Sequence, residues 1–595
     1  MPRFFGPSSR ALVGLALTLA GPCLARAVDL AIDEVEWRDP DLPAPPSQLR
    51  FSKSVVPLWR QSLARQDAEP RRLACDTIGL AAGRGMTGLD EFVAPLSAIV
   101  ADDPDPLVRR AAAGALVALD ARGAADVLAR AAARDGVVAA AIVEPALARW
   151  GSTVATQPWL DRLSAADTPP ALVALAVDGL GRTGAEAAAE PLERLLLDAD
   201  ARPEQRLAAA RALGRIRDAG LVPLAERLAA SPARPGGPRA DPRTPPDLLG
   251  RLAAVRLLAR HADAAALALV TRLAEDPEPT VAAEALERLD RLDAGATLAI
   301  ARRSLAGPDA ALRLLAARLA VRPADADAVE RVKHLLSDRN PPVRRFVAGT
   351  LADFATRPEL HGPVIAAGSE VLGGDDWRGL EQAALLLGHL DHEPSGDRLL
   401  ALLDHARPEV AIAAAWGLKA LAIPEMLPRI LTYAEALAPR VDPAKQPTEV
   451  TGAQATQLFE LFGLTRYAPA DTLLRRFVPK SQLDTRARAA AIWALGWIHA
   501  DNPDEELAEQ LAERLADTTS LPPEMPAVRT QSAVALGRMG AKSQLRTLEQ
   551  FVDADGIGVP SGRASAWAVE RLTGKPYPEI PTITTGIRGW FLEPP

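Results

Sequence analysis

The segment 102–123, DDPDPLVRRAAAGALVALDARG, predicts an amphipathic helix that follows an acidic, proline-containing turn. At about 100° per residue one helical face is apolar, and it consists of Val108, Ala112, Ala115, Leu116 and Leu119. Gly114 lies at the middle of the opposite face, which the pattern predicts to be exposed, together with Arg110. Residues 89–100 show their own helical spacing. The pattern therefore predicts a helix-turn-helix unit.

The unit recurs along the chain when the position of Ala112 is used as the anchor of R-x-x-A-x-x-A-L or a close variant. The anchors are Ala74, Ala112, Val143, Ala176, Ala209, Ala254, Ala282, Ala316, Val347, Ala383, Ala414, Leu458, Ala491, Ser532 and Ala566. Their mean spacing of about 35 residues is typical of helical repeats. Because one helix pair cannot bury its apolar face alone, neighbouring pairs stack. The prediction is an all-α fold, an α-solenoid of roughly fifteen stacked helix-turn-helix repeats over 55–572.

The unit resembles a HEAT repeat, and its A-x-x-A-L-G ending is similar to the HEAT-like repeats associated with phycobilisome lyases. The resemblance rests on a turn Asp followed by a Val-Arg pair, which are Asp105, Val108 and Arg109 here, with Arg344, Arg488 and Arg529 as further matches. It covers about 55–572 and implies the fold, whereas such repeats serve many binding tasks. No bilin-attachment motif carries over.

The mature chain is predicted to begin with an acidic, proline-rich arm, 28–54, which either stays mobile or covers the first repeat with Trp37 as its anchor. Two repeats are lengthened by proline-rich insertions, 231–247 and 438–452, which are surface loops or binding loops. Residues 573–595 form an extended tail that contains Tyr577, Trp590 and Phe591, and that is expected to cover the last repeat.

Residues 1–27 have the features of an export signal. Arg3 and Arg10 precede a short apolar core, and Ala25-Arg26-Ala27 forms an A-x-A cleavage site. The sequence thus predicts an exported protein, periplasmic or secreted, without a stable membrane span after cleavage. Cys75 is then the one remaining cysteine, and its place on an apolar stripe favours a core residue over a reactive thiol.

Composition agrees with a close-packed helical array, because aromatic residues are 4% of the chain, apolar residues are 48%, and the 52 prolines can end helices at intervals. The formal charge of −8 argues against nucleic acid as the main partner, which requires a basic surface.

Metal chemistry has one candidate in the sequence. His389 and His392 stand three residues apart with carboxylates nearby, although a helix end running into a loop at 388–396 favours ordinary solvated side chains. The sequence contains no H-E-x-x-H, C-x-x-C-H, Walker or G-x-S-x-G motif. No cofactor and no catalytic residue is therefore assigned.

The recurrent arginines have two interpretations. They either line up as an anion-binding surface or, as the stronger interpretation, pair with turn carboxylates and link adjacent repeats.

Tryptophans give the sharpest candidate site. Trp416 and Trp493 occupy the repeat position of Gly114, Glu460 occupies it in the intervening repeat, and Phe459 and Trp567 lie one position away. If second helices line a concave face, these residues form a partner-binding patch on its C-terminal half. The alternatives are that the extra proline-rich loops fold back over them or that the tryptophans pack between adjacent second helices. Trp497 is expected to be structural.

The leading hypothesis is a non-catalytic scaffold that binds a protein or an extended polymer on its concave face. The alternatives are an enzyme-associated or cofactor-handling protein, bilin-lyase-like or with a metal at His389 and His392, and a structural spacer of the cell envelope.

Overall fold

The computed structural model describes residues 28, 30–45, 47–49, 55–165, 167–230, 248–441, 449–578 and 583–585. The predicted export signal, the insertion 231–247, and Trp590 and Phe591 of the tail lie outside these residues. The chain divides into two compact units. The first comprises Met1–Asp33 and Ala317–Ile430, and the second comprises Glu34–Ala316 and Leu431–Pro595.

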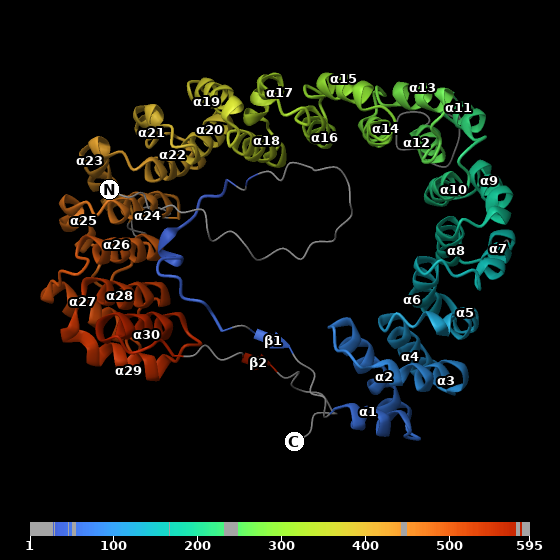
Figure 1. The fold of residues 1–595 in the computed structure, drawn as a ribbon, viewed down its shortest axis with the longest axis horizontal. Helices are drawn as coiled ribbons and strands as arrows, with labels where there is room; N and C mark the ends of the chain where they lie inside the picture. The colour runs from blue at the N-terminus through green and yellow to red at the C-terminus, as the bar shows by residue number, and fades with distance from the viewer. Residues whose placement is uncertain are drawn as a thin grey trace. The chain divides into compact units, whose positions relative to one another are not determined.

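Helices account for nearly all of the regular structure, and in the described residues α1 to α30 form fifteen successive helix-turn-helix pairs (Figure 1). The first helices of the pairs are α1 (Val55–Leu63), α3 (Val93–Asp102), α5 (Ala125–Arg134), α7 (Thr156–Ser164), α9 (Ala189–Leu197), α11 (Val222–Ala230), α13 (Ala264–Leu273), α15 (Ala294–Ser304), α17 (Ala326–Val332), α19 (Pro358–Leu372), α21 (Gly396–Leu402), α23 (Leu427–Leu437), α25 (Asp471–Arg475), α27 (Glu505–Ala516) and α29 (Leu545–Asp555). The second helices are α2 (Ala68–Gly83), α4 (Pro106–Ala118), α6 (Gly136–Arg149), α8 (Pro170–Thr183), α10 (Pro203–Ile216), α12 (Leu248–Leu257), α14 (Pro279–Asp290), α16 (Ala310–Ala320), α18 (Pro341–Phe354), α20 (Trp377–His389), α22 (Pro408–Leu421), α24 (Glu449–Leu464), α26 (Thr485–Ile498), α28 (Pro526–Met539) and α30 (Pro560–Thr573).

The predicted buried stripe is confirmed. All fifteen anchor residues lie in the second helices, and none is more than 3% exposed. In α4, Asp105 caps the helix by accepting a hydrogen bond from Leu107 N–H at 2.7 Å, and Pro106 occupies the first turn. Successive second helices pack on one another, as α24 does on α26 and α26 on α28. The fold is thus the all-α solenoid that the repeat pattern predicts.

Glycines bring the second helices close together. A Cβ added to Gly496 of α26 would lie 2.8 Å from Ala535 Cα of α28, and one added to Gly537 would lie 2.7 Å from Ala568 Cα of α30. Those distances are far shorter than ordinary van der Waals contact. The G of the A-L-G ending is therefore a packing residue at these two crossings.

The prediction that arginines link adjacent repeats is also confirmed. Arg109 Nη1 donates to the Asp103 carbonyl of its own turn at 2.8 Å, and Arg109 Nε donates to Asp135 Oδ2 in the next repeat at 3.0 Å. The hydrogen bond from Arg109 lowers the pKa of Asp135 to about 2. Equivalent ion pairs join Arg71 to Asp103, Arg251 to Asp276, Arg344 to Glu381, Arg488 to Glu524 and Arg529 to Asp555.

Cys75 is a core residue, as predicted. Its side chain is fully buried in α2, and burial raises the pKa of the thiol to about 12. The thiol therefore stays protonated over the physiological range.

The rest of the chain contains short elements only. The 3₁₀ helices are η1 (Val35–Trp37), η2 (Asp90–Phe92), η3 (Arg122–Ala124), η4 (Glu186–Ala188), η5 (Lys333–Ser337), η6 (Glu393–Ser395), η7 (Pro424–Met426), η8 (Ala438–Val441), η9 (Ala468–Ala470) and η10 (Lys542–Gln544). Strand β1 (Ser47–Leu49) pairs in parallel with β2 (Ile583–Thr585), with Ser47 opposite Ile583.

The insertion predicted at 438–452 is helical at both ends, so its loop is shorter than expected. Residues 438–441 form η8, and α24 begins at Glu449, two residues after the last proline of the segment. Residues 442–448 lie outside the described chain.

Candidate functional site

The predicted patch lies on second helices, but its central residues are not exposed. Trp416 of α22, in the first unit, is 9% exposed, and Glu460 of α24 and Trp493 of α26, in the second unit, are fully buried. The prediction that this position is exposed is therefore wrong for these three residues. The physical reason is that residues 28 and 30–45 of the N-terminal arm lie over them.

In the first unit, the arm is held by its backbone and by Asp33. Val28 N–H donates to the Gly349 carbonyl of α18 at 3.0 Å. Trp416 Nε1 donates to Asp33 Oδ1 at 2.9 Å, and Lys419 Nζ donates to the Asp33 carbonyl at 2.8 Å. Lys419 is 4% exposed, so its ammonium group is directed at the arm rather than at solvent.

In the second unit, side chains of three second helices bind the main chain of the arm. Glu460 Oε1 of α24 accepts hydrogen bonds from the N–H groups of Val35 and Glu36, the latter at 3.2 Å. Gln531 Nε2 of α28 donates to the Glu36 carbonyl at 2.7 Å. Trp493 Nε1 of α26 donates to the Asp39 carbonyl at 2.8 Å. Four main-chain groups of 35–39 are thus bound by side chains.

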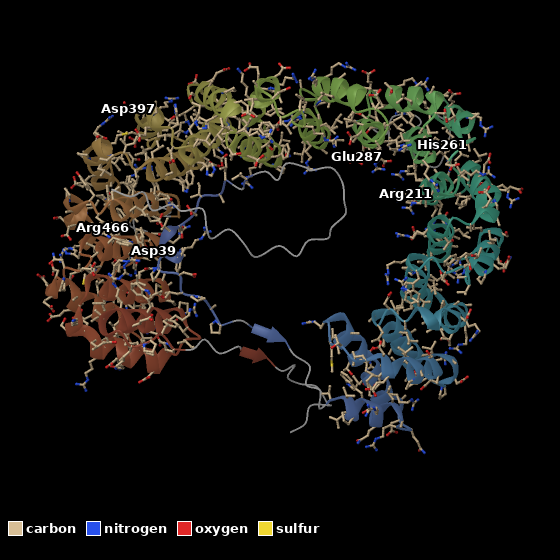
Figure 2. The ribbon with its side chains drawn as sticks, in the orientation of Figure 1. Asp39, Arg211, His261, Glu287, Asp397 and Arg466 are labelled. Atoms are coloured by element: carbon tan, nitrogen blue, oxygen red, sulfur yellow. The ribbon has the colours of Figure 1, made fainter. Side chains whose placement is uncertain are left out.

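The Asp39 carboxylate of the arm also binds side chains of the second unit, and Asp39 is labelled in Figure 2. Its Oδ2 atom accepts from Trp497 Nε1 at 2.8 Å and lies 2.9 Å from Arg538 Nη2. The Arg538 guanidinium lies 4.2 Å from the centroid of the Trp497 ring, and Arg466 lies 4.8 Å from the same centroid. We call Glu460, Trp493, Trp497, Gln531 and Arg538 the arm-binding surface.

Two titratable groups at this surface are buried, and burial shifts the pKa of each. The Glu36 side chain is buried against the Glu460 carboxyl, and burial, followed by the effect of Glu460, raises the pKa of Glu36 to about 11. Burial lowers the pKa of Arg538 to about 10, which the nearby Asp39 carboxylate partly opposes. At neutral pH Glu36 of the docked arm is therefore protonated, and Arg538 keeps its charge.

The two outer members of the predicted patch have different environments. Phe459 is a core residue and not part of a surface, since its ring packs edge-on against Phe477 at a centroid distance of 4.8 Å and is 1% exposed. Trp567 of α30 is half-buried, with the guanidinium groups of Arg538 and Arg571 each 5.9 Å from its ring centroid.

The other expectations for the arm were wrong. Its described contacts lie on α18, α22, α24, α26 and α28 and not on the first repeat, because its carboxylates meet buried basic residues and indole N–H groups there. Trp37 is not an anchor, because it is 49% exposed and its Nε1 donates to Glu34 of the arm itself. Trp497, expected to be structural, binds Asp39.

The histidine candidate has a local structural role. His389 is the last residue of α20, and His392 precedes η6, where its Nδ1 atom lies 2.8 Å from Ser395 Oγ. Burial, with a smaller effect of His361, lowers the pKa of His392. Among the residues that the structure describes, no group of three or more His, Cys, Asp or Glu is arranged to hold a metal ion.

A different part of the second unit is hollowed. Side chains of α2, α4 and α6 surround a space of about 670 Å³, which we call the first-repeat hollow. Its lining includes Leu80, Leu107, Arg110, Gly114 and Val138. Leu80, Leu107 and Val138 are exposed, so this hollow is mostly apolar at its rim.

Residues 56–145 match the family model of HEAT repeats. Among solved structures, the chain is similar to one from a study of Kap95p binding to RanGDP, with a TM-score of 0.50 and 14% identity over 88% of this chain and 72% of that one. It is also similar to yeast importin-β, Kap95p, with a TM-score of 0.43 and 12% identity over 87% of this chain and 66% of that one. No curated protein matches the chain in sequence. At these identities the likeness shows the fold alone.

The sequence predicts the arm but not where it binds, and it gives no indication of the partners Lys419, Gln531 and Arg538. The sequence feature that could have indicated this pairing is the opposite charge of the arm and of its partners. The arm is strongly acidic, and Lys419 and Arg538 are basic residues that lie among mainly small and apolar residues in the C-terminal halves of their helices. In the described helices, none is long and apolar enough to cross a bilayer.

Proposed function

We propose that the protein is a non-catalytic scaffold that binds a protein partner in extended conformation across its second helices. The proposal rests on one observation: side chains of α24, α26 and α28 bind the main chain of residues 35–39 of the arm. A surface that binds one extended peptide through its main chain has the chemistry needed to bind another.

The chemical groups at this surface are typical of protein–protein recognition. Indole N–H donors, an amide, a carboxylate and a guanidinium each bind a main-chain or carboxylate group, and tryptophan and arginine dominate the energetics of protein interfaces. The likeness to Kap95p, which binds RanGDP, supports protein binding for a solenoid of this fold.

Export to the periplasm or beyond the cell is part of the proposal, and it rests on the charged start, apolar core and A-x-A site of 1–27. Fractionation of cells that express the full chain tests it. Full-length protein that still carries 1–27 in the cytoplasmic fraction would overturn export without affecting the binding proposal.

The binding proposal is tested by affinity capture from envelope extract with wild-type protein, Trp416→Phe and Trp497→Phe. Each change keeps an aromatic ring and removes the indole N–H that binds the arm. Trp150→Phe is the matched control, because Trp150 is a half-buried tryptophan whose N–H binds Asp120, away from the arm.

The expected result is a partner captured by wild type and by Trp150→Phe whose yield changes in the other two variants, with circular dichroism spectra unchanged. A partner list identical in all four proteins would overturn the role of this surface.

A further inference from the structure

We propose that residues 34–39 are a tethered stand-in for an acidic, extended peptide of a partner protein, which displaces them from the arm-binding surface. This inference rests on the proposed function and names the chemistry of its partner.

Most of the recognition is directed at main-chain groups. Glu460, Gln531 and Trp493 bind N–H and C=O groups of Val35, Glu36 and Asp39, which any extended peptide presents. The Trp37 side chain between them contributes little, since it is 49% exposed. The surface therefore does not require the sequence of the arm.

One position does require a particular side chain. Asp39 Oδ2 meets Trp497 Nε1 at 2.8 Å and Arg538 Nη2 at 2.9 Å, and Arg538 is 3% exposed. A buried guanidinium without an anionic partner is costly. The displacing peptide must therefore place a carboxylate at the position of Asp39.

The arm fills this surface incompletely. Within the described residues, Arg538 Nη1 and Gln531 Oε1 are buried and have no hydrogen-bond partner. A carboxylate that engages both guanidinium nitrogens would add a charge-assisted hydrogen bond that Asp39 does not make.

Glu36 is the residue of the arm that fits the arm-binding surface least well. Its carboxyl group is buried against that of Glu460, and a buried acid without a basic partner opposes docking at neutral pH. A peptide with leucine at this position avoids that cost, so the arm is a ligand that a better peptide can replace.

The covalent tether compensates for these defects. A linked segment acts at an effective concentration on the order of millimolar. The arm thereby sets a threshold affinity, below which a free acidic peptide does not displace it.

The test uses fluorescently labelled peptides of residues 33–41 and measures anisotropy with the full-length chain. The receptors are wild type, Asp39→Ala, which weakens the arm, and Asp39→Ala combined with Trp497→Phe. The peptides are the native sequence, the Glu36→Leu peptide and the Asp39→Asn peptide.

The native peptide is expected to bind the Asp39→Ala receptor at least about tenfold more tightly than it binds wild type, because the tethered competitor is weakened. The Glu36→Leu peptide should bind more tightly again, and the Asp39→Asn peptide should lose at least about tenfold. The receptor that also carries Trp497→Phe should bind the native peptide more weakly.

Equal binding of the native and Asp39→Asn peptides, or no binding to the Asp39→Ala receptor, would overturn the inference. A wild-type dimer that Asp39→Ala abolishes would show arm exchange between two copies of the chain and would overturn it as well. An envelope polysaccharide that competes for the surface when acidic peptides do not would have the same effect.

The result is separable from that of the capture experiment. Peptide binding without any captured partner would leave this surface assigned and remove the scaffold function. A captured partner whose binding no acidic peptide inhibits would support the scaffold function and overturn the inference about an acidic peptide.

Discussion

The second helices α2, α4 and α6 and the second helices α24, α26 and α28 are built in the same way and present different surfaces. Both groups bury the anchor residues, and both are linked by arginine–carboxylate pairs such as Arg109–Asp135 and Arg488–Glu524. Yet the first group surrounds an open hollow, whereas the second binds the arm.

The difference arises at one repeat position. It is Gly114 in α4, where an added Cβ would meet no atom within 4 Å, and Trp493 in α26, whose ring lies against Gly463 of α24. Repeat stacking thus fixes the buried face, whereas residues outside the anchor positions, among them Trp493, Gln531 and Arg538, bind the arm on the outer face.

The largest expected effect concerns the arginine–carboxylate pairs that join adjacent repeats in both regions. Arg488→Ala should lower the free energy of unfolding by about 3 kcal/mol, because it leaves Glu524 buried with only Arg514 at 3.6 Å. Arg109→Ala should cost about 1 kcal/mol, since Asp135 keeps its contact with Arg134 at 3.0 Å. Urea unfolding of both variants measures the difference, and equal losses would contradict the contrast in burial.

A smaller effect tests the helical phase in the hollow region. Ala112→Leu should overpack the fully buried stripe of α4 and cost about 1 to 3 kcal/mol. Arg110→Ala, on the half-exposed face that lines the hollow, should cost about 0.5 kcal/mol or less. Thermal unfolding distinguishes the two, and equal destabilisation would show that the assigned phase is wrong.

Of the two regions, only the one that binds the arm should depend on pH through the ionisation of Glu36. Its pKa rises from 4.5 to about 11 on docking, so the docked arm binds a proton that the free arm releases. Arm docking is therefore strongest below pH 4.5 and weakens as the pH rises, by at most about tenfold per pH unit, or about 1.4 kcal/mol.

Hydrogen exchange of 34–39 between about pH 5.5 and about pH 8.5, corrected for the intrinsic exchange rate, measures this dependence. Glu36→Gln should flatten it, because an amide can donate as the protonated carboxyl does. Glu34→Gln is the control that should retain it, since Glu34 lies at the rim, 3.7 Å from Arg486. Protection that increases with pH would contradict the sign.

The smallest expected effect concerns glycine. Gly114→Ala should stabilise the chain by about 0.5 to 1 kcal/mol, because it removes helix-interior glycine and meets open space. Gly496→Ala should have the opposite sign, because its Cβ would lie 2.8 Å from Ala535 Cα. Differential scanning calorimetry measures both, and stabilisation by Gly496→Ala would refute the close helix crossing.

The sequence was sufficient to predict what repeats in it. The buried anchors, the arginine links and the position shared by Trp416, Glu460 and Trp493 follow from a period of about 35 residues. The arm could not be placed in this way, because Asp39 and Arg538 lie about 500 residues apart and neither belongs to a periodic pattern that relates them. Exposure of the tryptophans was misjudged for the same reason, since a repeat pattern contains no information on what covers its outer face.

The order of synthesis gives the arm a further consequence. Residues 34–39 leave the ribosome before α24, α26 and α28 exist, and Gln531 and Arg538, which bind them, are made about 500 residues later. Closing so long a loop is slow compared with forming neighbouring helix pairs. Docking of the arm therefore follows the formation of α28, and a chain interrupted before α28 is left with an undocked arm that is exposed to proteases.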